Sequence, residues 1–444
     1  MVTGARQRRV GFHTFGCKLN HFETDALASS LRGQGFSIVA AAEQADIYII
    51  NTCTVTARAD HKARSFIRQL SRIRPEATLF VTGCSAQVEA ARLSAIAPSV
   101  VVIPQAEKSR LLDLPRLLLD TRDRRGGGLS RGSRAGMTAD DPFQFLVEGN
   151  GFRTRTFLKI QDGCDSRCSY CRVPQARGAS VSLEAAEVIR RAQDLESRGH
   201  REIIITGANI STYRSGATSL NGLLRSLLDS TLHARFRLSS LEPEAITEDL
   251  AGVLAHERIC PHFHIPIQSG SDSVLTRMKR RYGTDTVRHG VGLLRSVRSN
   301  PFIAADIIVG FPGETQDEFA QTRRLVESLA LSALHVFPYS PRPGTAAAGM
   351  RPTVPERLRS ERAQALSDLS RELSSAYAKS WVGKDLEAIL EEYEGSQARA
   401  VAGNYLKMRV SGLPDGADYR GRLALARITS AGPTCQARFL AFSG

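Results

Sequence analysis

The stretch GCDSRCSYCRVPQARG, residues 163–178, places Cys164, Cys168 and Cys171 within eight positions. Their C-x3-C-x2-C spacing comes directly after the strand-like sequence FLKIQ. Thiolates are soft ligands that suit zinc and iron–sulfur clusters. A closed structural site uses four protein ligands, so three cysteines leave one corner of a metal centre open. The spacing therefore predicts a metal centre that binds a substrate, on a loop at the rim of a sheet.

The sequence FLKIQ belongs to a series of alternating strand-like and helix-like patterns between about residues 150 and 345. Its six strand candidates are RTFLKIQ, EIIITG, RFRLSS, FHIPIQ, IAADIIVG and ALHVFPYS. Such alternation predicts a parallel sheet, and six strands are two short of a closed (β/α)8 barrel. We therefore predict a partial (β/α)6 barrel over residues 143–354, open on one side for a large substrate. Within it, Ser182 is the predicted N-cap of a helix that ends before Gly199.

An earlier series occupies residues 1–120 and has the strand candidates VGFHTFG, DIYIINT, TLFVTG and SVVVIP. Helical patterns lie between these strands, so we predict a doubly wound parallel sheet, and an α/β protein overall.

Three further cysteines, Cys17, Cys53 and Cys84, each follow one of these strands within a residue or two. The carboxyl ends of parallel strands meet at one edge of the sheet, where α/β proteins bind their ligands. We therefore expect these distant cysteines to converge on a second site. Cys260 and Cys435 stand alone, and we interpret both as structural.

The remaining segments differ in character. Residues 121–142 are rich in Gly, Ser and Arg without periodicity, which predicts a flexible linker. Residues 355–384 are typical of one long connecting helix, and residues 385–444 of a small all-β module. From residue 396 onward this module holds seven Lys and Arg against two Asp. Basic strands with Tyr405 and Phe439 are compatible with RNA binding; an ordinary small barrel with a basic surface is the alternative.

Composition sets the limits for function. The 444 residues are 42% hydrophobic, enough for two or three domains with cores of their own. No run of 18 apolar residues occurs and the N-terminus lacks an apolar segment, so we expect neither a transmembrane helix nor a secretory signal. The cytoplasm is then the expected compartment, where clustered thiols indicate metal or redox chemistry. The net charge of +14 favours a nucleic-acid partner, although an arginine-rich composition alone explains it equally well.

The C-x3-C-x2-C loop after a first barrel strand resembles the signature of the radical S-adenosylmethionine (SAM) enzymes. Six further stretches resemble the methylthiotransferases within that family: TFGCKLNHFET, NTCTVT, VTGCSAQ, HIPIQSGSDSVLTRM, DIIVGFPGET and LHVFPYSPRPGT. They follow in order over roughly residues 10–410. The wording of TFGCKLNHFET, NTCTVT and HVFPYS is most similar to the bacterial branch that acts on threonylcarbamoyl-adenosine in tRNA.

The resemblance implies two 4Fe-4S clusters and SAM as cofactors. The three clustered cysteines would hold the cluster whose fourth iron binds SAM, which accounts for the missing ligand. The three dispersed cysteines would hold an auxiliary cluster that donates sulfur. The reaction would replace the adenine carbon-2 hydrogen with a methylthio group beside the anticodon. The implied partners are the tRNA anticodon stem-loop, bound by a TRAM-like C-terminal module, and an electron donor such as flavodoxin or ferredoxin.

The resemblance also indicates residues that contact SAM. Tyr170 stands where the family has an aromatic residue near the adenine of SAM. The other candidates lie in or near the ends of barrel strands, where a polar or turn role in the barrel explains each equally well: Gly207, Ser239, Glu242, Gln268 and Asp306.

Two local features complete the comparison with the family pattern. Arg177 is predicted either to neutralise a carboxylate or phosphate or to be a solvated charge. The loop TGANISTYRSG departs from the His- and Gly-rich loop that is common in this branch.

Other functions remain open at this point. The same chemistry on isopentenyl-adenosine in tRNA, or on an aspartate of a ribosomal protein, would use the same cysteines. A non-catalytic, metal-stabilised RNA-binding protein is the alternative of a different class. Three-cysteine sites disfavour it, since structural sites close with four ligands.

Overall fold

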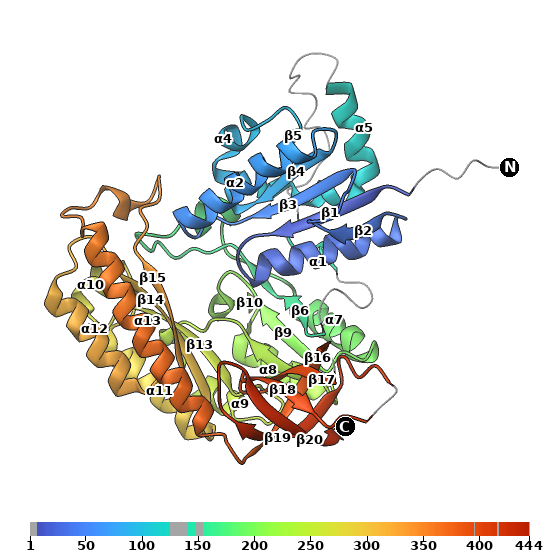
Figure 1. Cartoon of the computed structure of the whole chain (residues 1–444). Helices are drawn as coiled ribbons and strands as arrows, with labels where there is room; N and C mark the ends of the chain where they lie inside the picture. The colour runs from blue at the N-terminus through green and yellow to red at the C-terminus, as the bar shows by residue number, and fades with distance from the viewer. Residues whose placement is uncertain (1–6, 125–140, 147–153, 395, 415–416, 444) are drawn as a thin grey trace. The chain divides into compact units, whose positions relative to one another are not determined.

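The computed structural model describes residues 7–124, 141–146, 154–394, 396–414 and 417–443 (Figure 1). Most of the predicted linker 121–142 lies outside the described residues. The chain forms two compact units. The first unit includes Asp162–Asp165 and Cys171–Val181 besides the N-terminal region, and the second holds Ser166–Tyr170 together with the rest of the chain. The segment that carries the clustered cysteines is thus divided between the units.

The first unit contains five parallel strands in the order β2-β1-β3-β4-β5. Their bounds are β1 Arg9–Thr14, β2 Ser37–Ala40, β3 Ile47–Thr52, β4 Thr78–Gly83 and β5 Val100–Val102. The four predicted strands are confirmed. The edge strand β2 was missed because its four residues are only half-buried or exposed, so they show no apolar pattern.

Helices cover both faces of this sheet, with α1 on one side and α2 and α4 on the other (Figure 1). Their bounds are α1 Lys18–Gly33, α2 Ala57–Ile73, α3 Cys84–Val88, α4 Ala90–Ser94, the 3-10 helix Gln105–Asp113 and α5 Leu114–Arg124. The doubly wound α/β prediction is therefore confirmed. The helix predicted after β4 divides at Glu89, whose φ of −134° is not helical.

The second unit contains six parallel strands in two hydrogen-bonded groups, β12-β9-β6 and β13-β14-β15. A bridge between Ser240 and His264 connects the groups. The strand bounds are β6 Thr156–Lys159, β9 Glu202–Thr206, β12 Arg235–Leu238, β13 His262–Gln268, β14 Phe302–Val309 and β15 Ala333–Pro338. This series of six confirms the predicted partial (β/α)6 barrel.

The helices of this series are α7 Ala185–Ser197, α8 Leu220–Ser230, α9 Glu248–Leu254, α10 Asp272–Arg277, α11 Thr284–Val297 and α12 Gln316–Leu329. The short strands are β7 Gln161–Asp162, β8 Val181–Ser182, β10 Arg214–Ser215 and β11 Thr218–Ser219, and three short 3-10 helices are Ile210–Thr212, Pro243–Ala245 and Ala346–Gly349. The predicted N-cap Ser182 is wrong: it lies in β8, and Glu184 precedes α7. The connecting helix α13 spans Glu356–Lys379 and ends before the predicted residue 384.

The C-terminal module is a closed barrel of five strands in the order β16-β17-β18-β20-β19. The strands are β16 Asp385–Glu394, β17 Gln397–Ala402, β18 Lys407–Ser411, β19 Leu423–Ser430 and β20 Cys435–Ser443. Buried alanines dominate its interior, among them Ala388, Ala400 and Ala424. Their small side chains let the walls of a narrow barrel close on one another. This confirms the all-β prediction.

A buried charge cluster connects the partial barrel to this C-terminal module. Glu202 on β9 accepts hydrogen bonds from Arg235 at 2.9 Å and Arg237 at 2.7 Å. Arg237 also donates to the Gly403 carbonyl at 2.9 Å, between β17 and β18. Burial alone would raise the pKa of Glu202, but Arg237 and Arg235 lower it to about 2. The Glu202 carboxylate is thus ionised at neutral pH and holds two buried arginines in place.

We expect Glu202→Gln to lower the free energy of unfolding by about 3–5 kcal/mol at pH 7, because two buried cations lose their partner. The pKa of Glu202 is lower in the folded protein, so its contribution is present above the unfolded value of 4.5 and is lost as the pH falls toward 2. Melting temperatures of wild type and variant should therefore begin to converge below about pH 4.5 and meet near pH 2. Glu187→Gln, which removes a partly exposed surface partner of Arg190 and Arg191, is the matched control and should cost much less. Equal losses in both variants would contradict the prediction.

Among the described residues, no helix is long and apolar enough to cross a membrane.

Candidate active site

The dispersed cysteines lie at the edge of the first sheet where strand order reverses. Cys17 follows β1 and precedes α1, Cys53 follows β3, and Cys84 is the first residue of α3 after β4. In doubly wound sheets of this strand order, ligands bind at the point between β1 and β3. The hydroxyl of Ser85, next to Cys84, donates to the Cys53 carbonyl at 3.0 Å, and Gly16, next to Cys17, packs against the Cys53 side chain, so the loops of the three cysteines meet. No disulfide joins any cysteine in the described part of the chain.

Two glycines permit this convergence. Gly16 has a φ of +109°, and a Cβ atom there would lie 2.8 Å from the Cys53 sulfur. Gly83 has a φ of +97°, and its Cβ atom would lie 2.3 Å from the Thr52 carbonyl oxygen. Glycine is favoured at both positions by backbone conformation, and any side chain would collide with the neighbouring loop. The loops that carry Cys17, Cys53 and Cys84 therefore approach one another more closely than other residues would allow.

The electrostatic setting fits a cationic metal cluster. Burial, together with Cys17 and Cys84, raises the pKa of the Cys53 thiol to about 12. Burial likewise raises the pKa of Cys84, while Arg177 and Lys108 lower it. Thiols in this state release their protons only when a metal supplies positive charge at their centre. Cys17 is exposed, so the site is open on one side. Three buried or converging thiols with one open side suit a 4Fe-4S cluster that keeps one corner for a ligand.

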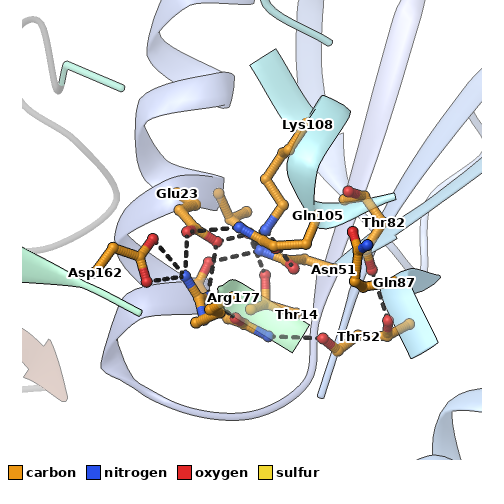
Figure 2. Close-up of polar contacts among 12 residues, drawn as sticks. Thr14, Glu23, Asn51, Thr52, Thr82, Gln87, Gln105, Lys108, Asp162 and Arg177 are labelled. Atoms are coloured by element: carbon orange, nitrogen blue, oxygen red, sulfur yellow. Dashed lines mark hydrogen bonds and ion pairs between the residues drawn. The ribbon is translucent and has the colours of Figure 1, made fainter. Parts of the chain in front are cut away.

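Polar side chains of the first unit form a network of hydrogen bonds and ion pairs (Figure 2). Asn20, which belongs to this network, donates to the carbonyl of Thr52, next to Cys53, at 2.9 Å. Arg177, only 2% exposed, donates to Glu23 at 2.9 Å, to Asp162 at 3.0 Å and to Asn20 at 2.9 Å. Lys108 contacts the other oxygen of Glu23 and donates to Asn51 at 3.1 Å. Burial alone would lower the pKa of Arg177, but Asp162 and Glu23 raise it. Of the two predicted roles of Arg177, neutralisation of carboxylates is confirmed and a solvated charge is excluded.

The same arginine ends the segment that follows the clustered cysteines. Helix α6, Val173–Arg177, begins two residues after Cys171, whose sulfur accepts a hydrogen bond from the Val173 amide at 3.4 Å. The Cys164 amide donates to the Gly178 carbonyl at 3.1 Å. Arg172 donates to Thr54, the neighbour of Cys53, at 3.3 Å. Contacts within the first unit thus hold the segment that carries Cys164 and Cys171 against the loop of Cys53.

We expect Arg177→Met to destabilise the first unit by about 3–5 kcal/mol, because Glu23 and Asp162 then stay buried without their shared cation. The measurement is thermal unfolding of the anaerobically purified protein, with iron content as a second readout. Arg190→Met is the matched control, since that arginine is largely exposed and pairs only at the surface. An unchanged melting temperature for Arg177→Met would contradict a positioning role.

Cys168 belongs to the second unit, and Arg280 lies against it. Arg280 Nη1 is 3.1 Å from the Cys168 sulfur and 3.5 Å from the Tyr170 hydroxyl. Its other terminal nitrogen contacts the Glu242 carboxylate. Burial raises the pKa of Glu242 to about 7, although Arg280 pulls it down. The structure therefore brings two predicted SAM contacts, Tyr170 and Glu242, to one arginine beside one cysteine. No local pattern singles out Arg280, because it stands among several basic residues in TRMKRRYG.

The remaining predicted SAM contacts lie along the same barrel. Gly207 follows β9, and a Cβ atom there would lie 2.8 Å from the Gln161 side-chain oxygen. Ser239 is buried just beyond β12. Gln268 ends β13 with a φ of +68°, a strained conformation for a residue with a side chain. Asp306, in the middle of β14, is held between two histidines.

The departing loop TGANISTYRSG contacts the same rim. The Ser211 hydroxyl accepts a hydrogen bond from the Glu242 amide at 2.9 Å, and the Asn209 amide donates to the Gln161 side chain at 2.8 Å. The loop, which follows the second barrel strand, thus contacts residues just beyond the ends of the first and third strands.

Comparisons with known proteins match both units. Residues 9–104 match the family described as "Uncharacterized protein family UPF0004", and residues 158–326 match the radical SAM superfamily. The threonylcarbamoyladenosine tRNA methylthiotransferase MtaB of Treponema pallidum is 38% identical, over 90% of this chain and 94% of its own length. The enzyme of that name from Bacillus subtilis is 36% identical, over 95% and 94%. The tRNA-2-methylthio-N(6)-dimethylallyladenosine synthase of Cereibacter sphaeroides is 32% identical, over 97% and 98%.

Solved structures show likeness in fold alone. The radical SAM methyltransferase TsrM from Kitasatospora setae superposes with a TM-score of 0.54 and 17% sequence identity, over 77% of each chain. The cobalamin-dependent radical SAM enzyme OxsB superposes with a TM-score of 0.51 and 12% identity, over 77% of this chain and 55% of its own.

Proposed function

The chain belongs to the radical SAM tRNA methylthiotransferase family, and we propose that it replaces the adenine carbon-2 hydrogen of threonylcarbamoyl-adenosine beside the anticodon with a methylthio group. The observation that carries the proposal is the pair of three-cysteine groups, each one ligand short of a closed site. The choice of threonylcarbamoyl-adenosine as the substrate rests on two relatives, 38% and 36% identical, whose names contain it.

Each group of three cysteines would hold one cluster. Cys164, Cys168 and Cys171 would hold the 4Fe-4S cluster that binds SAM, and the three dispersed cysteines would hold the auxiliary cluster. When bound, these groups supply a carbon radical able to attack an unactivated C–H bond and the sulfur that replaces the hydrogen. Arg280 would fix Cys168 and Glu242 at the SAM site. Arg177 would keep the Cys171 segment in register with the auxiliary cysteines.

The C-terminal barrel supports a tRNA substrate. Arg399 on β17 and Arg409 on β18 lie directly opposite each other, and both are exposed. Arg399 also forms a surface ion pair with Glu392 at 3.4 Å. The two arginines still outnumber this carboxylate, so the face suits the binding of a polyanion. Lys407 and Arg438 extend the exposed basic surface along β18 and β20. Tyr405, one of the two aromatic residues that we considered for RNA binding, is not part of this basic face. Its ring stacks on His262 of the partial barrel at 4.2 Å.

The second candidate is the same reaction on isopentenyl-adenosine, because a synthase of that type is 32% identical over 97% of the chain. Mass spectrometry of tRNA nucleosides separates the two, with a strain that lacks the gene beside its parent. We expect methylthio-threonylcarbamoyl-adenosine to disappear and its precursor to accumulate. Loss of the methylthio-isopentenyl derivative alone would support the methylthiolation reaction but overturn threonylcarbamoyl-adenosine as the substrate. If no nucleoside changes although the deletion is verified, tRNA is not the substrate.

A further inference from the structure

Three side chains from neighbouring strands meet in the interior of the partial barrel. Asp306 on β14 and His335 on β15 are direct partners in the register of the sheet. His264 comes from β13, on the other side of β14. On β13, Phe263 and Ile265 are fully buried on one face, so His264 between them points to the opposite face. The exposed fractions of the three side chains are 13% for His264, 22% for Asp306 and 53% for His335.

The ligand atoms of these side chains already stand at distances typical of neighbours around one ion. His264 Nε2 is 2.8 Å and His335 Nδ1 is 3.3 Å from the same oxygen, Asp306 Oδ1. All three atoms lie within 4.8 Å of one another. A metal binds imidazole nitrogen and carboxylate oxygen at about 2.0–2.2 Å, which places two ligands roughly 3.0–3.5 Å apart. Small shifts would therefore let the three atoms share one ion.

A simple hydrogen-bonded triad explains the arrangement less well. His264 Nε2 is fully buried and, despite its 2.8 Å distance from Asp306, has no hydrogen bond of normal geometry among the described residues. A buried imidazole nitrogen without such a partner costs free energy unless something else satisfies it. Both imidazoles also converge on one oxygen, although the carboxylate has two. A cation at the meeting point would satisfy both nitrogens and the carboxylate.

We propose that His264, Asp306 and His335 bind one divalent first-row transition ion inside the barrel. Two imidazoles and one carboxylate are the ligand set of non-haem iron sites with open positions; imidazole also suits zinc, and carboxylate suits manganese. Three protein ligands leave positions for further oxygen ligands.

The location of this site gives it a function in the reaction. The Leu241 amide donates to the His264 carbonyl at 2.8 Å, and the next residue, Glu242, contacts Arg280, which lies against Cys168. The ion would therefore share the barrel interior with the SAM site. The threonylcarbamoyl group carries a carboxylate, a hydroxyl and carbonyl oxygens, all of which suit the open positions; an isopentenyl group carries none. The inference thus rests on the proposed function and assigns to the ion the recognition of the oxygen-rich substituent.

Manganese binding tests the site directly. The full-length protein, with clusters reconstituted and oxidised, is titrated with MnCl2, and free Mn²⁺ is followed by electron paramagnetic resonance. We expect one saturable site in wild type and at least about a tenfold weaker affinity in Asp306→Asn and in His264→Ala. His289→Ala, which removes an exposed histidine from α11, is the control and should bind as wild type does. Retained cluster absorbance and melting temperature show that each variant is folded. Equal Mn²⁺ affinity in wild type and both folded triad variants would overturn the proposal.

Zinc content gives an independent measurement. After anaerobic dialysis against ZnCl2 and then metal-free buffer, elemental analysis should find one zinc per wild-type chain that Asp306→Asn lacks. Binding of threonylcarbamoyl-adenosine and isopentenyl-adenosine nucleosides is then compared with and without the ion. The ion should strengthen the binding of threonylcarbamoyl-adenosine and leave the binding of isopentenyl-adenosine unchanged. If the bound ion strengthens the binding of neither nucleoside, its role in substrate recognition is overturned, while the metal site itself stands. If the deletion strain lost only the isopentenyl derivative, the proposed function would fail while the Mn²⁺ titration could still succeed, so the two failures are distinguishable.

Discussion

Replacing Cys168 with Ala is expected to abolish reductive cleavage of SAM. Two thiolates hold a 4Fe-4S cluster poorly, and the iron that binds SAM depends on the three clustered cysteines as a set. Cys168 is also the cysteine that Arg280 contacts at 3.1 Å, so its loss releases the arginine that holds Glu242. The measurement is 5′-deoxyadenosine formed by reconstituted protein with dithionite and SAM. We expect a fall to the level of the protein-free blank.

The control for Cys168→Ala is Cys435→Ala, which removes a buried cysteine of the C-terminal barrel. This control should cleave SAM at the wild-type rate, because Cys435 packs in the core of that barrel. 5′-Deoxyadenosine production by Cys168→Ala at an undiminished rate would sink the assignment of the clustered cysteines. A protein that makes none in its wild-type form would instead point to the non-catalytic RNA-binding alternative.

Replacing Cys53 with Ala is expected to leave SAM cleavage intact and to stop methylthiolation. Cys53 lies between Cys17 and Cys84 at the sheet edge, and burial raises the pKa of its thiol to about 12, so its ionisation depends on a bound metal. Iron content should fall by about half, since each of the two clusters holds four irons. The paired measurement is 5′-deoxyadenosine and methylthiolated nucleoside from the same reaction, with tRNA that carries threonylcarbamoyl-adenosine without the methylthio group.

The two measurements on Cys53→Ala distinguish the possible roles of the dispersed cysteines. Product formation by Cys53→Ala at the wild-type rate would exclude an auxiliary cluster on the dispersed cysteines. Loss of both SAM cleavage and product would show that the two cysteine groups are coupled. The contact of Arg172 with Thr54 is the structural route for such coupling, and Arg172→Gln would then reproduce it.

The sequence alone determined the elements that carry the chemistry. Strand and helix patterns are local, because burial of one face imposes a period of two or 3.6 residues on neighbouring positions. The βα series, the all-β module and the placement of Cys17, Cys53 and Cys84 after strands could therefore be predicted. The C-x3-C-x2-C spacing was equally local. The edge strand Ser37–Ala40 was not predicted, and the N-cap predicted at Ser182 is wrong. Both concern short segments with weak patterns.

Only the tertiary structure decided which polar groups meet. Glu23 and Lys108 are 85 residues apart and Arg177 is 154 residues from Glu23, yet all three share one buried contact. His264, Asp306 and His335 come from three strands that the sequence separates by helices. Such groups have no local signature, because each was an ordinary polar residue in its own segment. The free energy that places them together comes from packing the strands and helices around them, and that packing acts over the whole fold.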